Sequence, residues 1–158
     1  YPNLEKIPTL QEALDCIAGR VHVNIEIKSS EVATNIANIT RTYLEKPEWN
    51  NKDIVLSSFS NATVNMLRRH YKELKLSYLV YDHYCNLKDM KVLKSNYFRY
   101  NLHSLNLPLE GITPEIVEYC NTENIRIYVY TVNETKQIRY LRELGVNGVF
   151  TDFPKLIR

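Results

Sequence analysis

The stretch Val21-His22-Val23-Asn24-Ile25-Glu26-Ile27-Lys28 decides the fold, because its pattern is typical of a strand that ends in two opposite charges. Successive side chains of a strand point to opposite faces, so the aliphatic positions 23, 25 and 27 share one face and the polar positions 24, 26 and 28 share the other. Charge within an apolar run is costly to bury unless it is paired or binds a metal. The stretch is therefore either an edge strand with a Glu26–Lys28 ion pair or a strand that carries a functional site.

Helical and strand patterns alternate along the whole chain. Thr9 and Glu12 form a capping box before a helix that ends at Gly19. Further helices are predicted over 31–43, 60–71, 114–121 and 134–144, with a short helical turn over 87–93. Strands are predicted over 21–28, 53–59, 74–81, 97–105, 125–132 and 148–152. Strands that alternate with helices through short connections run parallel. The pattern thus predicts a single α/β domain over residues 1–158, with six parallel strands.

Polar and aromatic residues stand at the carboxyl ends of three predicted strands: Glu26 with Lys28, Ser58 with Phe59, and Thr131 with Asn133. Functional groups of parallel α/β proteins gather at that end of the sheet. The alternative for each is a helix cap that follows a strand, and this is the role that we expect for Ser60 and Asn133.

Composition excludes several classes of protein. The 158 residues are 44% hydrophobic and 24% charged, as in a globular domain, and the net charge of +2 is too small to indicate nucleic-acid binding. No apolar run approaches the roughly 18 residues of a membrane span. Cys16, Cys85 and Cys120 are too widely spaced for a disulfide framework or a zinc site. They favour a reducing compartment, so we expect a cytoplasmic protein.

Five segments, taken in order, resemble the glycerophosphodiester phosphodiesterase family: residues 7–14, 24–28, 57–60, 130–133 and 145–154. Each is a weak match by itself, but together they span almost the whole chain. The resemblance implies a TIM-type (β/α)8 barrel of about 250 residues, of which this chain would supply strands three to eight.

The resemblance also implies that part of the site lies outside this sequence. Family members carry a His-Arg-Gly segment, a Pro-Glu-Asn-Thr segment, a Glu-x-Asp strand and a His-Asp pair, none of which occurs here. These supply both catalytic histidines, the phosphate-binding arginine and two of three metal-ligating carboxylates. We therefore expect an incomplete barrel that is inactive without its missing strands, which the same protein or another chain would provide.

Four residues match functional positions of the family. Glu26 corresponds to the third ligand of a divalent cation, Ca²⁺ or Mg²⁺, and Lys28 to a catalytic positive charge beside the phosphate. Phe59 and Tyr130 correspond to aromatic residues that bind the glycerol of the substrate, although the family more often has Trp at the second position. By strand parity, Ser57 and Tyr128 should fill the barrel interior, and Asp152 is expected in a structural turn.

The implied activity is metal-dependent hydrolysis of a small glycerophosphodiester to glycerol 3-phosphate and an alcohol, a step in phospholipid headgroup catabolism. A hard cation is needed because a phosphodiester anion repels nucleophiles. Two alternatives stay open: a non-catalytic barrel that binds phosphate or a lipid headgroup, and a lyase similar to sphingomyelinase D.

Overall fold

Six parallel strands form one sheet in the computed structural model, which describes residues 6–49 and 54–157. The strands pair in the order β1-β2-β3-β4-β5-β6, so each neighbours the next in sequence. Their bounds are Val23–Glu26, Ile54–Ser58, Lys75–Leu79, Ser104–Pro108, Ile127–Tyr130 and Gly148–Val149. The prediction of six parallel strands that alternate with helices is confirmed.

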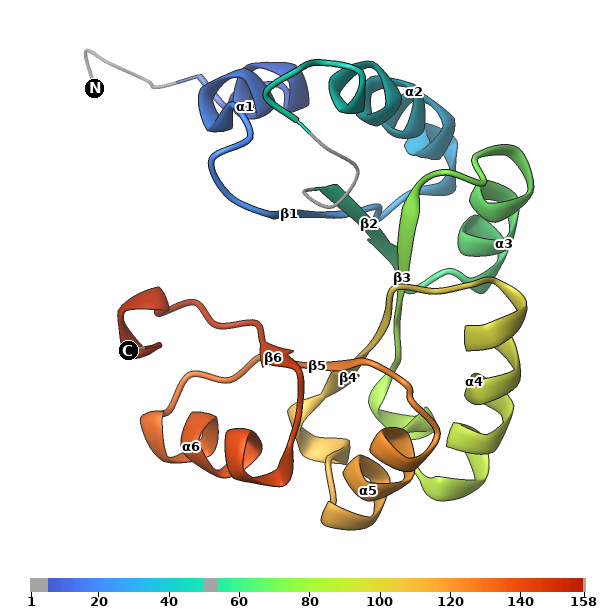
Figure 1. Ribbon diagram of the computed structural model, residues 1–158, viewed down its shortest axis with the longest axis vertical. Coiled ribbons are helices and arrows are strands. Elements are labelled where there is room, and N and C mark those ends of the chain that lie inside the picture. The colour runs from blue at the N-terminus through green and yellow to red at the C-terminus, as the bar shows by residue number, and fades with distance from the viewer. Residues whose placement is uncertain (1–5, 50–53, 158) are drawn as a thin grey trace.

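The sheet curls into an open half-barrel with its helices on the outer side (Figure 1). The helices are α1 (Leu10–Ile17), α2 (Ala33–Leu44), α3 (Asn61–His70), α4 (Leu87–Arg99), α5 (Pro114–Thr122) and α6 (Thr135–Leu144). Short 3-10 turns η1 (Ser30–Val32), η2 (Asp82–Tyr84), η3 (Leu109–Gly111) and η4 (Pro154–Leu156) lie between them or after them. This architecture is that of a partial TIM barrel, as the resemblance implied.

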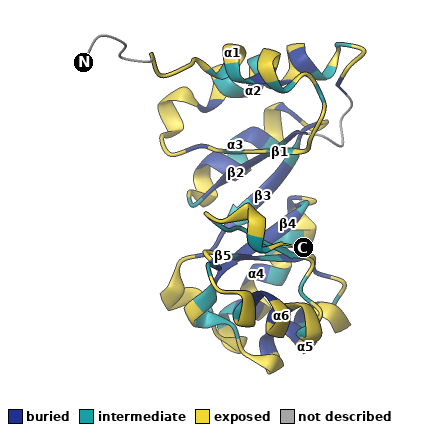
Figure 2. Cartoon of the chain, turned by 90° about the vertical axis from the view of Figure 1, so that its left-hand side faces the viewer, coloured by how far each residue is buried: buried dark blue, intermediate teal, exposed yellow. Residues whose placement is uncertain are grey.

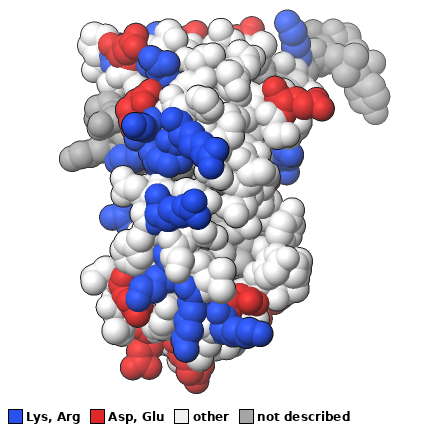
Figure 3. All heavy atoms as spheres, turned by 90° about the vertical axis from the view of Figure 1, so that its right-hand side faces the viewer, with Lys and Arg blue, Asp and Glu red and all other residues white. Residues whose placement is uncertain are grey.

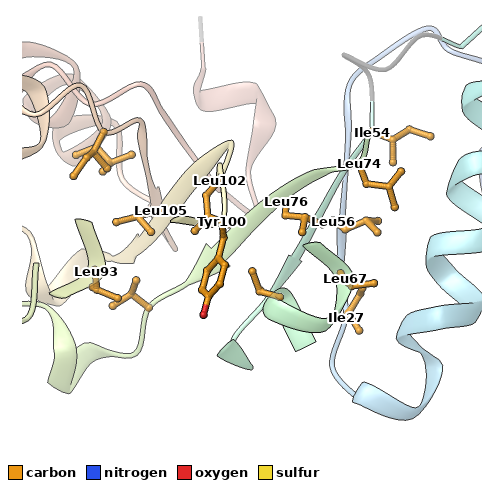
Figure 4. Close-up of a cluster of buried hydrophobic side chains, with 14 of the residues drawn as sticks. Ile27, Ile54, Leu56, Leu67, Leu74, Leu76, Leu93, Tyr100, Leu102 and Leu105 are labelled. Atoms are coloured by element: carbon orange, nitrogen blue, oxygen red, sulfur yellow. The ribbon is translucent and has the colours of Figure 1, made fainter. Parts of the chain in front are cut away.

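The main hydrophobic core lies between the outer face of the sheet and the helices (Figure 4). Leu56, Leu76 and Leu105 point outward from successive strands and are almost completely buried. Figure 2 shows the same division along the molecule, with buried strands and helices that are exposed on their outer sides. The opposite, concave face of the sheet carries the polar side chains, because strand residues alternate between the two faces.

The predicted strand over 97–105 is wrong at its start. Residues 97–99 belong to α4, which is much longer than the predicted turn over 87–93, and β4 begins only at Ser104. The side chain of Asn86 accepts hydrogen bonds from the backbone N–H groups of Lys88 and Asp89, and this N-cap stabilises the first turn of the helix. Asn101, with φ at 45°, provides the left-handed turn between helix and strand.

The predicted cap at Asn133 is also wrong. Glu134 occupies the N-cap of α6 and makes no side-chain capping bond. The Asn133 side chain instead donates to Asp152 Oδ2 and accepts from the Asp152 N–H and from Thr151. It therefore joins two loops, and Asp152 lies in the structural turn that the sequence predicted.

Other predicted boundaries hold or shift slightly. The Ser60 hydroxyl caps α3 by accepting from the Thr63 N–H at 3.1 Å, as predicted. Strand β6 is shorter than the predicted 148–152. The predicted start of the second strand, Asp53, lies outside the described residues.

In the described part of the chain, no helix is long and apolar enough to cross a membrane, and the three cysteines are free thiols.

Candidate functional site

Glu26 and Lys28 form an ion pair at the carboxyl end of β1, the first strand of the sheet. Lys28 Nζ lies 3.4 Å from Glu26 Oε1, and their side chains are 82% and 35% exposed. The charges are thus not buried in this structure, because β1 lies at an edge of the half-barrel. The edge-strand ion pair that the sequence offered as one alternative is present, and its groups are accessible to a ligand.

Strand β2 holds the neighbouring part of the site in place through its serines. Ser57 accepts a hydrogen bond from Asn24 Nδ2 at 3.0 Å on the concave face, so β1 and β2 are joined there. Ser58, on the outer face, donates to the Ile27 carbonyl at 2.8 Å and accepts from the Ser60 N–H. These bonds fix the backbone on both sides of Phe59.

The structure brings Phe59 and Tyr130 together, although 71 positions separate them in the sequence. Their ring centroids lie 5.9 Å apart at an interplanar angle of 89°, an edge-to-face contact. The Tyr130 hydroxyl donates to the Val80 carbonyl at 2.5 Å. Burial raises the pKa of the Tyr130 hydroxyl, with smaller contributions from the negative charges of Asp82, Glu110 and Glu26. Tyr130 and Glu26 therefore belong to the same end of the sheet.

Sequence reasoning missed an aromatic extension of this site. The Tyr81 ring lies 4.6 Å from Phe59, and His83 stacks on Tyr81 at 5.7 Å. Tyr84 follows at 4.1 Å from His83, so the rings continue from Phe59 to the surface. The sequence position of these rings could have indicated this extension, because they directly follow β3 and functional side chains gather at the carboxyl ends of strands.

The described residues do not by themselves make a site for Ca²⁺ or Mg²⁺. Within 6–49 and 54–157, no group of three histidine, cysteine, aspartate or glutamate side chains could hold a metal ion. Such cations require six or more oxygen ligands, and the Glu26 carboxylate provides at most two. In this chain Glu26 is paired with Lys28 instead.

The concave face below the site is polar and hollow. Ser57 is buried there, and Tyr128 contributes to the lining of a cavity of about 560 Å³, so both lie in the interior position predicted by strand parity. A chain of hydrogen bonds joins Ser77, Ser104 and Asn106 across β3 and β4. The site therefore stands on a polar inner surface rather than on an apolar one.

Comparison with known proteins agrees with this geometry. The family model of the glycerophosphoryl diester phosphodiesterases matches residues 1–156. The chain belongs to this family. It is 28% identical over 156 residues to a glycerophosphodiester phosphodiesterase of Caldanaerobacter subterraneus subsp. tengcongensis, and 28% identical over 153 residues to one of Bacillus altitudinis. These alignments cover 97% and 94% of this chain, but only 61% and 60% of the relatives.

Solved structures of the family share the fold. A phosphodiesterase of Oleispira antarctica, crystallised with the product sn-glycerol-3-phosphate, superimposes with a TM-score of 0.77 at 19% identity. A glycerophosphodiester phosphodiesterase of Thermotoga maritima gives a TM-score of 0.74 at 24% identity. The matches cover 95% and 96% of this chain and 59% and 63% of those chains. This chain thus spans about three-fifths of the length of its relatives.

Proposed function

We propose that this protein takes part in the hydrolysis of glycerophosphodiesters to glycerol 3-phosphate and an alcohol. The observation that carries the proposal is the arrangement of Glu26, Lys28, Phe59 and Tyr130 at one end of the sheet, in a chain that belongs to the phosphodiesterase family. This end of the sheet carries both a lysine cation and an aromatic surface. A phosphodiester of a small polyol combines the two groups that such a surface binds.

Lys28 is the group that we assign to the phosphate. Its ammonium is 82% exposed and its only ion-pair partner among the described residues is Glu26. A fixed positive charge next to a phosphoryl oxygen stabilises the charge that develops in the transition state. Glu26 holds the ammonium at the strand end, so the pair orients Lys28 before substrate binds.

Glu26 would also donate one oxygen to a divalent cation, which would neutralise the phosphodiester. Because the described residues lack a complete ligand set, the remaining oxygens would come from polypeptide outside them, from water and from the substrate phosphate. The same polypeptide would supply the acid and base groups for proton transfer. We therefore propose that further barrel strands, from the same protein or another chain, complete the active site.

Phe59 and Tyr130 would bind the glycerol through their ring faces and edges. Their edge-to-face contact is fixed by the Tyr130–Val80 hydrogen bond and by Ser58, so the surface is formed before substrate arrives. The Oleispira antarctica structure contains sn-glycerol-3-phosphate, and this supports the product that we propose. The tyrosine hydroxyl is already occupied by a carbonyl, so it contributes shape more than hydrogen bonding to the ligand.

The first test is an assay on the protein expressed from its entire reading frame. Glycerol 3-phosphate release from glycerophosphocholine is measured with and without a chelator, for wild type and for Glu26→Gln and Lys28→Met. We expect Glu26→Gln to abolish metal-dependent release and Lys28→Met to lower kcat/KM by about 10²–10³-fold. Glu31→Gln, a nearby acidic residue that forms none of the described ion pairs, is the control and should retain activity.

The same assay separates the alternatives. A ³¹P spectrum that shows a cyclic phosphate product would favour the lyase. Saturable binding of glycerol 3-phosphate without any turnover would favour the non-catalytic barrel. Wild-type activity in Glu26→Gln would contradict the assignment of Glu26 as a metal ligand.

A further inference from the structure

The concave face of the half-barrel contains a positively charged cavity at the amino-terminal end of the strands, opposite the candidate site. It has a volume of about 560 Å³, and Lys75, Arg126, His22 and His103 contribute to its lining. None of its described lining residues is an aspartate or a glutamate. Figure 2 shows the molecule from the open side of the half-barrel, on which this inner surface faces outward.

Arg126 lies against the His103 ring in this cavity. Arg126 Nη1 is 3.2 Å from His103 Nδ1, and the His103 ring stacks on Tyr128 at 6.2 Å. Burial, followed by the charges of Arg126, Lys75 and His22, lowers the pKa of His103 to about 4. His103 is therefore neutral at pH 7, and the local potential is positive.

Neither Lys75 nor Arg126 has a described counter-charge. In the described part of the chain, no carboxylate forms an ion pair with either residue, whereas other cations pair with acids on the outer surface. Lysine and arginine residues also gather on the outer, helix-covered side (Figure 3). Lys75 and Arg126 instead line the concave face of the sheet at the amino-terminal end of the strands.

Asn106 also contributes to the lining of this cavity, and its side-chain donor has no hydrogen-bond partner among the described residues. Asn106 is 1% exposed, and its Oδ1 accepts from Ser104, which in turn is bonded to Ser77. Its Nδ2 is buried and has no hydrogen-bond partner.

The edges of the sheet indicate what covers this surface. Strand β1 pairs only with β2, and β6 pairs only with β5, so one side of each is open. Relatives in the family are longer, since this chain matches 61% of the Caldanaerobacter subterraneus protein. Barrel interiors are filled by side chains from all strands around the ring.

We propose that the polypeptide completing this barrel places at least one aspartate or glutamate carboxylate against Lys75 and Arg126, at the amino-terminal end of the strands. The inference rests on the proposed function, which requires further strands to complete the barrel. It adds that these strands carry a negative charge at this position. A carboxylate there would neutralise the two cations. This ion pair would be structural and lies at the opposite end of the barrel from Glu26 and Lys28.

Carbodiimide coupling on the protein expressed from its entire reading frame tests this directly. The reagent condenses the Lys75 amine with a carboxylate in contact, an amide forms, and the reagent takes up the water as a urea. We expect mass spectrometry to find Lys75 joined to an aspartate or glutamate outside residues 1–158. Lys75→Arg should lose the cross-link but keep the melting temperature, and Lys75→Met should lower it by about 5–15 °C. Lys91→Met, on the outer face of α4, should change neither.

Several results would overturn the inference. One is a cross-link from Lys75 only to Asp53 of this chain, which lies outside the described residues. Another is stabilisation of the wild type, but not of Lys75→Met, by inorganic phosphate without any cross-link, which would identify a small-anion site. A protein that forms no cross-link yet releases glycerol 3-phosphate would refute this inference and leave the proposed function standing. A cross-linked protein without activity would do the reverse.

Discussion

His103 is the residue whose titration most directly affects stability. In the folded protein its pKa is lowered from its usual 6.5 to about 4, chiefly by burial and also by Arg126 and Lys75. The unfolded chain therefore takes up a proton first as the pH falls. The free energy of unfolding of the protein should therefore be unaffected above pH 7 and should decrease between about pH 6.5 and pH 4.

The lowered pKa of His103 predicts a measurable dependence of the free energy of unfolding on pH. From pH 7 to pH 5 the free energy of unfolding should fall by about 1–2 kcal/mol more in wild type than in His103→Gln, with allowance for the partial exposure of the ring. Urea denaturation at both pH values measures the difference. His70→Gln, an exposed histidine at the end of α3, should keep the wild-type slope. An unchanged slope in His103→Gln would contradict the lowered pKa.

At the same scale, sequence reasoning found the residues at strand ends but not their surroundings. Glu26, Lys28, Phe59 and Tyr130 were visible because they break an apolar pattern at predictable positions. The 35% exposure of the Glu26 side chain could not be predicted, because it depends on β1 being an edge strand, which is a property of the whole sheet. The ring contacts of Tyr81 likewise depend on tertiary packing between β2 and η2.

Among the elements, α3 and α4 are joined by one side chain. The Arg68 guanidinium donates from Nε to the Tyr100 carbonyl at 2.6 Å, from Nη1 to the Lys72 carbonyl at 2.6 Å, and from Nη2 to the Asn101 carbonyl at 3.2 Å. It thus satisfies carbonyls at the ends of two helices. Only the planar fork of arginine presents several donors in this geometry.

Arg68→Met should lower the free energy of unfolding by about 1–3 kcal/mol, since it leaves partly buried carbonyls without donors. Arg68→Lys should recover less than half of that loss. The neighbouring Arg69 is exposed and forms none of the described hydrogen bonds, so Arg69→Met provides a matched control with a change below about 0.5 kcal/mol. Equal losses in the two methionine variants, measured by urea denaturation, would refute the role of Arg68.

Element types followed from periodicity and caps, whereas some boundaries did not. Thr9, Ser60 and Thr113 cap helices as their sequence context indicated. The end of α4 was missed because Tyr97 and Tyr100 suit a strand as well as a helix, and burial against neighbouring elements decided between them. Asn133 was misassigned because its side chain has partners 18 and 19 positions away in sequence.

For the whole molecule, stability rests on the core between sheet and helices. Leu105, the second residue of β4, is completely buried there (Figure 4). Leu105→Ala should lower the free energy of unfolding by about 2–5 kcal/mol, because the rigid surroundings close the resulting cavity only in part. Val92→Ala, at a position 62% exposed on α4, should change it by less than about 0.5 kcal/mol. A small loss in Leu105→Ala on calorimetry would show that the core relaxes around the deletion.

The strand order has a consequence for how the molecule is made. Because each strand pairs with the one that precedes it in sequence, no pairing within the described sheet requires the chain to wait for a distant segment. Each helix–strand unit can therefore add to a growing sheet as synthesis proceeds. The half-barrel is therefore suited to assembly on the ribosome in the order of its residues.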